Sequence, residues 1–203
     1  MKGCTAINMN FILASKSPRR REILENLGVR FETVTADTDE SSDVTDPCRL
    51  VELLSARKGE AVREKLLAEG RDLSDTVIIS SDTVVAVDGE ILGKPRDAAD
   101  ARRMLRLLSG KAHQVVSGVC LIGNGKYGVS HEVTEVVFDE LDDETVEHYI
   151  RTAKPYDKAG AYAIQGLASA YISGIKGCYF NVVGLPVHRL NTLYCETFGE
   201  NFL

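Results

Sequence analysis

Two short segments carry residue types that together could hold a polyphosphate and direct water at it. Asp82 follows the apolar run Val77–Ile79 and two serines, whereas Arg19 and Arg20 follow a Ser-Pro pair near the start of the chain. A carboxylate can accept a proton from water, and arginine presents planar N–H donors that match phosphate oxygens. This combination predicts chemistry on a phosphate anhydride.

The local sequence around each candidate predicts how it is positioned. Ser17 followed by Pro18 is typical of a helix start, where free backbone N–H groups and the helix dipole favour an anion. The β-branched run Thr76–Ser80 predicts a central strand, and we expect Asp82 at its C-terminal edge, where α/β sheets usually bind ligands. Both features also have ordinary explanations, because paired arginines are mostly solvated and an aspartate after a strand often caps a turn.

Three further charged residues are candidates for the same site. Glu40, in an acidic segment over 36–47 that we expect to be a loop, could join Asp82 in binding a divalent cation through oxygen ligands. Alternatively, Glu40 only keeps that loop soluble. Lys58 on a predicted helix and Lys94 after a predicted hairpin would be ordinary solvent-facing lysines by themselves. Lys58 and Lys94 are candidates for the site only if the fold places them near Asp82.

Several common functional motifs do not fit this chain. Residues 123–128 match G-x-G-x-x-G, but a dinucleotide-binding motif needs a following helix, and the sequence from Val129 alternates like a strand. Asn124-Gly125 is therefore predicted to be a hairpin turn. The histidines lack metal-binding spacing, and the chain has neither a Walker A loop nor a G-x-S-x-G motif. These patterns argue against a zinc hydrolase, a P-loop enzyme and a serine hydrolase.

Composition indicates an ordinary soluble globular chain. The 203 residues are 44% hydrophobic and 27% charged, and the net charge of -6 argues against a nucleic-acid polymer as partner. The apolar segment Phe11–Ala14 is too short for a signal sequence or membrane span, and five scattered cysteines without a C-x-x-C pair fit a reducing compartment. We therefore expect a cytoplasmic protein with no membrane partner.

The order of predicted elements favours an α/β fold with a mixed sheet. Strands and helices interleave, but several strands follow one another as hairpin-like pairs, which disfavours a purely parallel sheet. No repeat, low-complexity tract or linker separates independent domains. We expect one domain over 1–203, with 1–10 as a short N-terminal extension.

Six ordered segments resemble the Maf family, and together they are far more specific than any single one. They are Ser15–Arg20, Ser81–Thr83, Gly93–Asp97, Leu108–Gly110, Asp157–Gly166 and Asn181–Pro186, and the resemblance spans about 11–195. The segment Asp157–Gly166 resembles the branch of the family that acts on dTTP and UTP, rather than the branch that prefers 7-methyl-GTP.

The resemblance implies a fold and an activity. The fold would be of the inosine triphosphatase type, with a strongly twisted mixed sheet and flanking helices in two lobes around a cleft. The activity would be hydrolysis of nucleoside triphosphates to a monophosphate and pyrophosphate, assisted by a divalent cation (Mg, Mn or Co). A homodimer is also implied.

Roles carry over to individual positions from the same resemblance. Asp82 corresponds to the proton acceptor and, with Glu40, to the acidic positions that would hold a metal. Arg19, Thr83 and Gln165 correspond to positions linked to substrate choice, and glutamine offers both a carbonyl and an amide group to a base edge. The remaining lining positions are Ser17, Arg20, Lys58 and Lys94.

These assignments lead to a mechanistic hypothesis and one alternative. Asp82 would deprotonate a water that attacks the α-phosphorus with help from the metal, while the arginines and lysines neutralise the pyrophosphate leaving group. The alternative is a nucleotide-sensing or partner-binding protein linked to septum formation, with little turnover.

Overall fold

The structure is a computed structural model that describes residues 9–203; Cys4 and most of the predicted extension 1–10 lie outside the described residues. In chain order the elements are β1 (Asn10–Leu13), α1 (Pro18–Asn26), β2 (Phe31–Thr33), α2 (Pro47–Ala68), β3 (Thr76–Val87), β4 (Glu90–Leu92), α3 (Ala98–Leu108), β5 (Ala112–Gly123), β6 (Lys126–Phe138), α4 (Asp143–Ala153), the 3₁₀ turns η1 (Ala159–Ala161) and η2 (Leu167–Tyr171), β7 (Ile172–Lys176), α5 (Tyr179–Val183) and α6 (Val187–Phe198).

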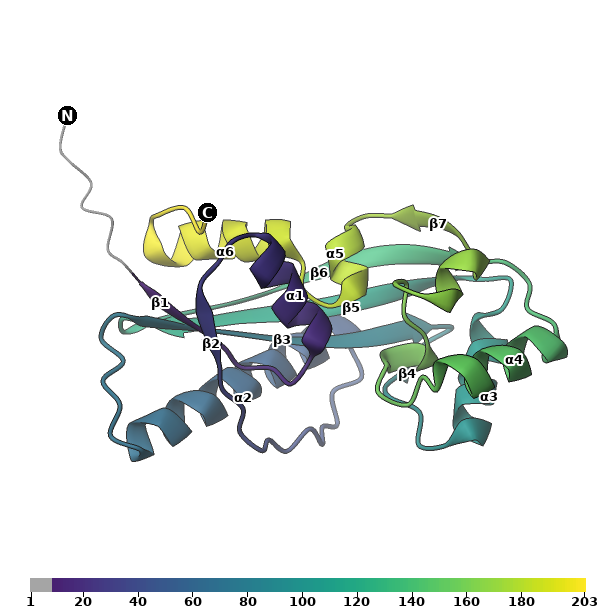
Figure 1. The fold of residues 1–203 in the computed structure, drawn as a ribbon, viewed down its shortest axis with the longest axis horizontal. Coiled ribbons are helices and arrows are strands. Elements are labelled where there is room, and N and C mark those ends of the chain that lie inside the picture. Colours follow the sequence, from purple (N-terminus) through teal and green to yellow (C-terminus); the bar gives the residue numbers. More distant parts are fainter. Residues whose placement is uncertain (1–8) are drawn as a thin grey trace.

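A mixed seven-stranded sheet runs along the length of the molecule (Figure 1). Its order is β2-β1-β3-β5-β6-β7, with β4 paired to β3. The pairs of β1 with β2 and β3 are parallel, whereas all other pairs are antiparallel. The predicted mixed α/β sheet with flanking helices is confirmed, whereas the division of a single domain into two lobes stays a prediction.

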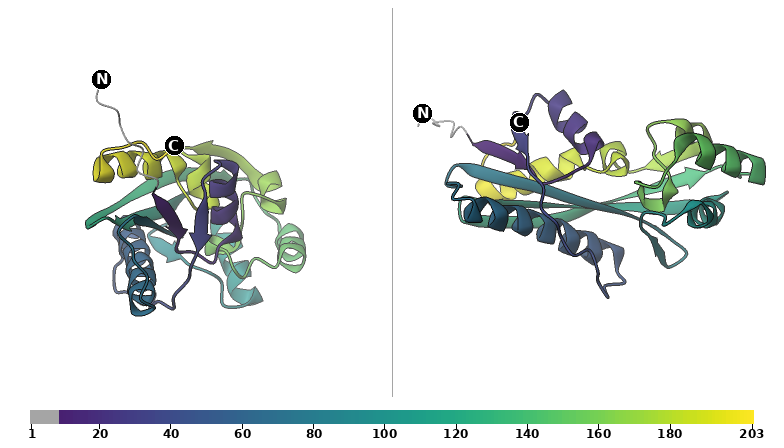
Figure 2. Two further views of the ribbon diagram at one scale, coloured as in Figure 1. Left: turned by 60° about the vertical axis from the view of Figure 1, so that its left-hand side comes forward. Right: turned by 60° about the horizontal axis from the view of Figure 1, so that its bottom comes forward.

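Helices cover both faces of the sheet. Strand β3 alternates its side chains, so Val77 and Ile79 join a core with α1 and α6, and Ile78 joins a core with α2 on the other face. Figure 2 shows α6 and α2 on opposite sides of the strands. A third core lies at the far end, where α3 and α4 pack on the ends of β3, β5 and β6. Among residues 9–203, no helix has the length and apolar character needed to cross a membrane.

The G-x-G-x-x-G segment is a hairpin turn, as predicted. Asn124 and Gly125 connect β5 to β6 and have φ angles of 50° and 69°. Positive φ at both central residues is the signature of a type I′ turn, the connection that suits the twist of a two-residue hairpin. The segment therefore contains no helix start that could bind a dinucleotide.

Within residues 9–203, one edge of β3 has no strand partner over Ser80–Val84. On this edge β1 pairs with residues 76–79 and β4 pairs with residues 85–87, while β5 pairs along the opposite edge throughout. Strand β1 leaves the sheet after its last contact, in which the Ala14 N–H donates to the Ile79 carbonyl at 2.8 Å. We call the unpaired stretch Ser80–Val84 the edge gap.

The prediction that Asp82 lies at the end of a strand is wrong. Asp82 lies in the middle of β3, because Ser80 and Ser81 continue the strand instead of ending it. Both serines are buried, and their hydroxyls donate to the carbonyls of Ser55 at 2.7 Å and Gly184 at 3.0 Å. The polar residues that suggested a turn are thus satisfied inside the core.

Two glycines allow α2 to lie close to the sheet beside Asp82. A Cβ at Gly59 would be 2.8 Å from Ser80 Oγ, and a Cβ at Gly118, the β5 residue paired with Asp82, would be 2.3 Å from the Val51 carbonyl oxygen. The contact at Gly118 is with backbone, so only glycine permits this approach there, whereas a side chain at Gly59 would require Ser80 and Ile122 to shift. The close packing brings α2 within reach of Asp82.

Gly118→Ala should therefore destabilise the protein by about 1–3 kcal/mol, because the added methyl group pushes α2 away from β5. Chemical denaturation measures the effect. Gly174→Ala is a matched control, since its Cβ would be 3.9 Å from Val137 in ordinary contact, and it should stay within about 1 kcal/mol of the parent. Equal stabilities for the Gly118 and Gly174 variants would contradict the proposed close contact.

Candidate functional site

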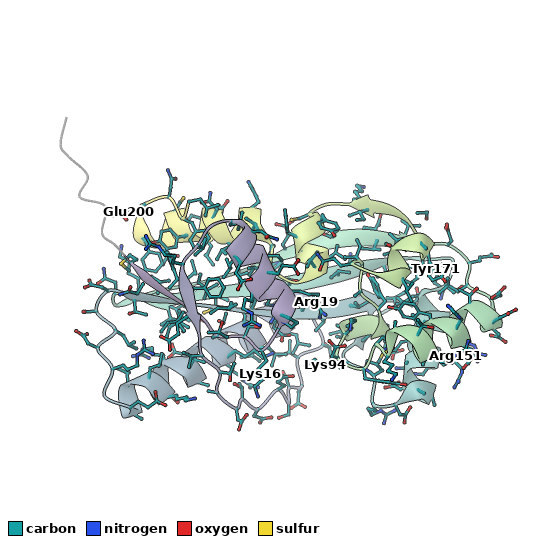
Figure 3. The ribbon with its side chains drawn as sticks, in the orientation of Figure 1. Lys16, Arg19, Lys94, Arg151, Tyr171 and Glu200 are labelled. Atoms are coloured by element: carbon teal, nitrogen blue, oxygen red, sulfur yellow. The ribbon has the colours of Figure 1, made fainter. Side chains whose placement is uncertain are left out.

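A cavity of about 1080 Å³ lies at the edge gap and is lined from several directions. Its walls come from the segment between β1 and α1, the loop before α2, α2 itself, the end of β4 and the segment after α4. Figure 3 shows Lys16, Arg19 and Lys94 in this central region of the molecule. Every predicted site residue lines the cavity: Ser17, Arg19, Arg20, Glu40, Lys58, Asp82, Thr83, Lys94 and Gln165.

Lys58 joins the two predicted acidic residues. Its ammonium donates a hydrogen bond to Asp82 Oδ1 and lies 2.8 Å from Glu40 Oε1. Asp82 is 8% exposed, whereas the Glu40 side chain is half exposed on the loop. The hydrogen bond from Lys58 lowers the pKa of Glu40. One cation thus holds the loop carboxylate and the strand carboxylate together.

The donor set of this cluster fits a hard divalent cation. Asp82 and Glu40 already converge on one positive group, so their oxygens can converge on a metal ion of the same sign. Within residues 9–203, no group of three or more histidine, cysteine, aspartate and glutamate residues forms a metal site. Mg²⁺ needs no such cage, because it is commonly held by one or two carboxylates together with water and substrate phosphates.

Arg20 is a partly buried cation whose hydrogen bonds within the protein all go to neutral groups. Nε donates to the Gly184 carbonyl at 2.8 Å, Nη1 to Ser15 Oγ at 3.2 Å and Nη2 to Thr83 Oγ1 at 3.1 Å. Burial lowers the pKa of Arg20, and the Asp82 carboxylate opposes that effect. Arg20 therefore braces α1 against β3 and α5 while its charge is left for an anion in the cavity.

Thr83 belongs to a chain of hydroxyl groups behind Arg20. Its Oγ1 accepts from Arg20 and lies 2.8 Å from Ser117 Oγ, which donates to the Asn181 carbonyl at 3.0 Å. These contacts join β3, β5 and α5, which are far apart in the sequence. The resemblance linked Thr83 to substrate choice, but no local pattern in the sequence reveals this chain of hydroxyl groups.

The remaining predicted residues lie at the rim of the cavity. Arg19 Nη1 is 3.6 Å from Asp157 Oδ2, and the Arg19 side chain is 26% exposed. Lys94 and Gln165 are exposed and lie in the lining. Asp157 was not predicted as an individual site residue, although it begins the segment that resembles the dTTP/UTP branch. The signal available in the sequence was an acidic side chain at the start of that motif.

A buried pair supports the segment that carries Gln165. Tyr162 lines the cavity, and its hydroxyl lies 2.7 Å from His113 Nε2 on β5. His113 also packs edge-on against Phe138. Burial lowers the pKa of His113 to about 4, so the imidazole is neutral at physiological pH.

A family model described as Maf-like protein matches residues 10–197. The chain belongs to the Maf-like family. Similar relatives named dTTP/UTP pyrophosphatase occur in Chromobacterium violaceum, with 46% identity over 91% of this chain and 92% of the relative, and in Ruminiclostridium cellulolyticum, with 43% identity over 91% and 94%. A relative of the same name in Symbiobacterium thermophilum is 46% identical over 88% and 89%.

Among solved structures, the Ham1 protein of Staphylococcus aureus matches 64% of this chain and 71% of its own chain, with 14% identity and a TM-score of 0.46. The Maf-like motifs of this chain meet in space despite their separation in the sequence. Residues from five of the six segments line the cavity, and only Leu108–Gly110 contributes none. Leu108 is instead fully buried in the core with α4.

Stability should fall as the pH is lowered from about 6.5 towards 4. The unfolded chain protonates His113 near its ordinary value of 6.5, whereas the folded protein keeps it neutral until about pH 4. The unfolded state thus binds more protons in this window, at a cost to stability on the order of 3 kcal/mol. Denaturant titrations at several pH values measure this loss.

His113→Gln should remove this part of the pH dependence, and His188→Gln, which changes an exposed histidine, should retain it. Parallel pH profiles for the parent and the His113 variant would show that His113 does not titrate as its burial requires.

Proposed function

We propose that this protein hydrolyses nucleoside triphosphates, dTTP and UTP among them, to a nucleoside monophosphate and pyrophosphate. The observation that carries the proposal is that one cavity holds a buried carboxylate, Asp82, together with Arg19, Arg20, Lys58 and Lys94. Such a site can bind a polyanion and deprotonate water beside it. The relatives named dTTP/UTP pyrophosphatase support the same activity and disfavour a sensing protein with little turnover.

Asp82 is the proposed proton acceptor. Its Oδ1 is engaged by Lys58, whereas its Oδ2 accepts no hydrogen bond from the protein within residues 9–203. Oδ2 would take a proton from the water as the water oxygen bonds to the α-phosphorus and the bond to the bridging oxygen breaks. The leaving pyrophosphate takes the electron pair, and the arginines and lysines neutralise its charge.

A divalent cation (Mg, Mn or Co) is part of the proposal. Asp82 and Glu40 would hold it, and when bound it supplies positive charge to the phosphate oxygens. Lys58 lies between these carboxylates, so it would have to share or leave its position, and the phosphates offer it an alternative partner.

Gln165 is the proposed reader of the base. It is exposed in the cavity lining, and its amide offers one acceptor and two donors, which can match the carbonyl and N–H groups on the edge of uracil or thymine. Thr83 already uses its hydroxyl with Arg20 and Ser117, so it would act by holding the arginine in place. Ser17 and Arg19 would contact the phosphates near the start of α1.

The proposal extends to the cellular setting of the protein. The net charge of -6 supports a nucleotide, not a nucleic-acid polymer, as the bound partner. Cysteines that are free within the described chain are consistent with a cytoplasmic location. We also propose a homodimer, which rests on the family alone, and no membrane partner.

Asp82→Asn should keep the fold and the affinity for nucleotide but lower kcat by about 10²–10⁴-fold, because the isosteric amide cannot accept the proton. Steady-state release of pyrophosphate measures kcat, and calorimetry with a non-hydrolysable triphosphate measures binding. Asp143→Asn, at an exposed ion pair on α4, is the control. Unchanged kcat in the Asp82 variant would exclude Asp82 as the base.

A substrate panel should give pyrophosphate and monophosphate from dTTP and UTP, with lower kcat/KM for purine triphosphates. Activity should be lost on addition of EDTA and return with Mg²⁺, Mn²⁺ or Co²⁺. Product chromatography distinguishes cleavage after the α-phosphate from release of orthophosphate. Tight binding of every triphosphate without any hydrolysis would favour the sensing protein.

A further inference from the structure

We propose that Asp100, on α3 outside the cavity, is a positioning residue that holds Lys94 at the cavity wall. The inference rests on the proposed function in one respect, namely that Lys94 binds the phosphates of the substrate. It assigns to Asp100 a part in substrate binding that acts only through Lys94. Three features of the structure support it.

The first feature is a clamp at the end of the segment that carries Lys94. Asp100 Oδ2 accepts a hydrogen bond from the backbone N–H of Arg96 at 3.1 Å and another from Arg96 Nε at 3.4 Å. Asp100 Oδ1 accepts from Arg103 Nε at 3.1 Å. Arg103 in turn contacts Glu90 on β4 at 2.6 Å. One carboxylate thus fixes the backbone at Arg96 and links it to the strand that precedes Lys94.

The second feature is the restriction of the backbone on either side of Lys94. The Gly93 carbonyl accepts from the Gly160 N–H at 3.0 Å, so the chain is fixed immediately before Lys94. Pro95 follows directly and is buried, and a residue before proline is confined to extended conformations. Because Gly93 and Arg96 are both held, the Lys94 backbone has little freedom to move away from the cavity.

The third feature is the isolation of the Lys94 charge. Within residues 9–203, the Lys94 ammonium makes no hydrogen bond or ion pair with the protein, although it lines the cavity. It is close enough to add to the effect of Lys58 in lowering the pKa of Glu40. The position of a lysine without a protein partner depends on its backbone, because its long, flexible side chain makes no contact that holds it in place.

Asp100 lies in the first turn of α3, where the helix dipole favours an acid, but the N-cap hydrogen bond of α3 does not come from it. That cap is supplied by Asp97, whose side chain accepts from the Asp100 N–H at 2.8 Å. The Asp100 side chain is instead 6% exposed and faces Arg96 and Arg103. The hydrogen bond from the Arg96 backbone lowers the pKa of Asp100, so the carboxylate stays charged in the clamp.

A double-mutant cycle of Asp100→Asn and Lys94→Met tests the inference. Asparagine keeps the shape but replaces one acceptor oxygen by a donor, so the clamp loses either the bond from Arg103 or both bonds from Arg96. Calorimetry with inorganic tripolyphosphate and Mg²⁺ measures phosphate binding without requiring hydrolysis. Asp100→Asn should weaken binding about fivefold, which is the order of one net hydrogen bond. In the Lys94→Met background, the same substitution should change binding less than about twofold.

The kinetic readout should agree with the binding readout. Asp100→Asn should raise KM for dTTP about fivefold and leave kcat within about twofold, because Asp82 and its surroundings are unchanged. Glu147→Gln, which removes an ion pair between α4 and Arg102 of α3, is the control and should change neither quantity. Amide hydrogen exchange over 93–97 should increase in the Asp100 variant only.

Three results would overturn the inference: no binding of tripolyphosphate by the parent, parent-like binding by Lys94→Met, or an equal effect of Asp100→Asn in both backgrounds. The last would show that Asp100 acts through general stability. If Asp100→Asn does not fold, Arg96→Ala tests the clamp through the loss of its Nε contact and should show the same dependence on Lys94. Coupled binding of tripolyphosphate without hydrolysis of any nucleotide would refute the proposed function and leave this inference intact.

Discussion

The incomplete pairing of one edge of β3 is the constraint on which the site depends. A strand in the middle of a sheet normally has neighbours on both edges, which leaves no room for a ligand beside its backbone. Here the pairing of β3 with β1 ends at Ile79 and its pairing with β4 begins at Val85, so Asp82 combines a rigid, buried strand with access to a cavity. The same arrangement delivers the chain after β1 and the chain after β4 to opposite sides of Asp82.

Charge is distributed unevenly around this gap, and the imbalance favours an anion. Lys58 is compensated by two carboxylates, whereas Arg20 is held by hydroxyl and carbonyl groups and Lys94 has no partner in the described chain. A partly buried cation with only neutral partners is costly, and an anion in the cavity offsets that cost. The whole chain nevertheless has a net charge of -6, so these cations without acidic partners lie in an otherwise acidic protein.

Local sequence patterns predicted most helices and turns, but not the tertiary hydrogen bonds between elements. Pro18 at the start of α1 and Asn124-Gly125 in the hairpin each act within a few residues, and both were predicted correctly. The position of Asp82 was wrong because Ser80 and Ser81 find partners on α2 and after α5, which no local pattern reveals. Order and spacing of the motifs predicted the family and the lining residues, whereas the hydroxyl chain behind Arg20 requires the folded backbone.

The length of the edge gap depends on how far β1 and β4 extend their pairing along β3. Every additional residue by which β1 or the β3–β4 hairpin extended its ladder would cover more of the backbone beside Asp82. Shortening the hairpin would uncover more of it without altering the carboxylate or its lysine. Insertions or deletions at these surface turns would therefore widen or narrow access to the cavity while the sequence of β3 stays the same.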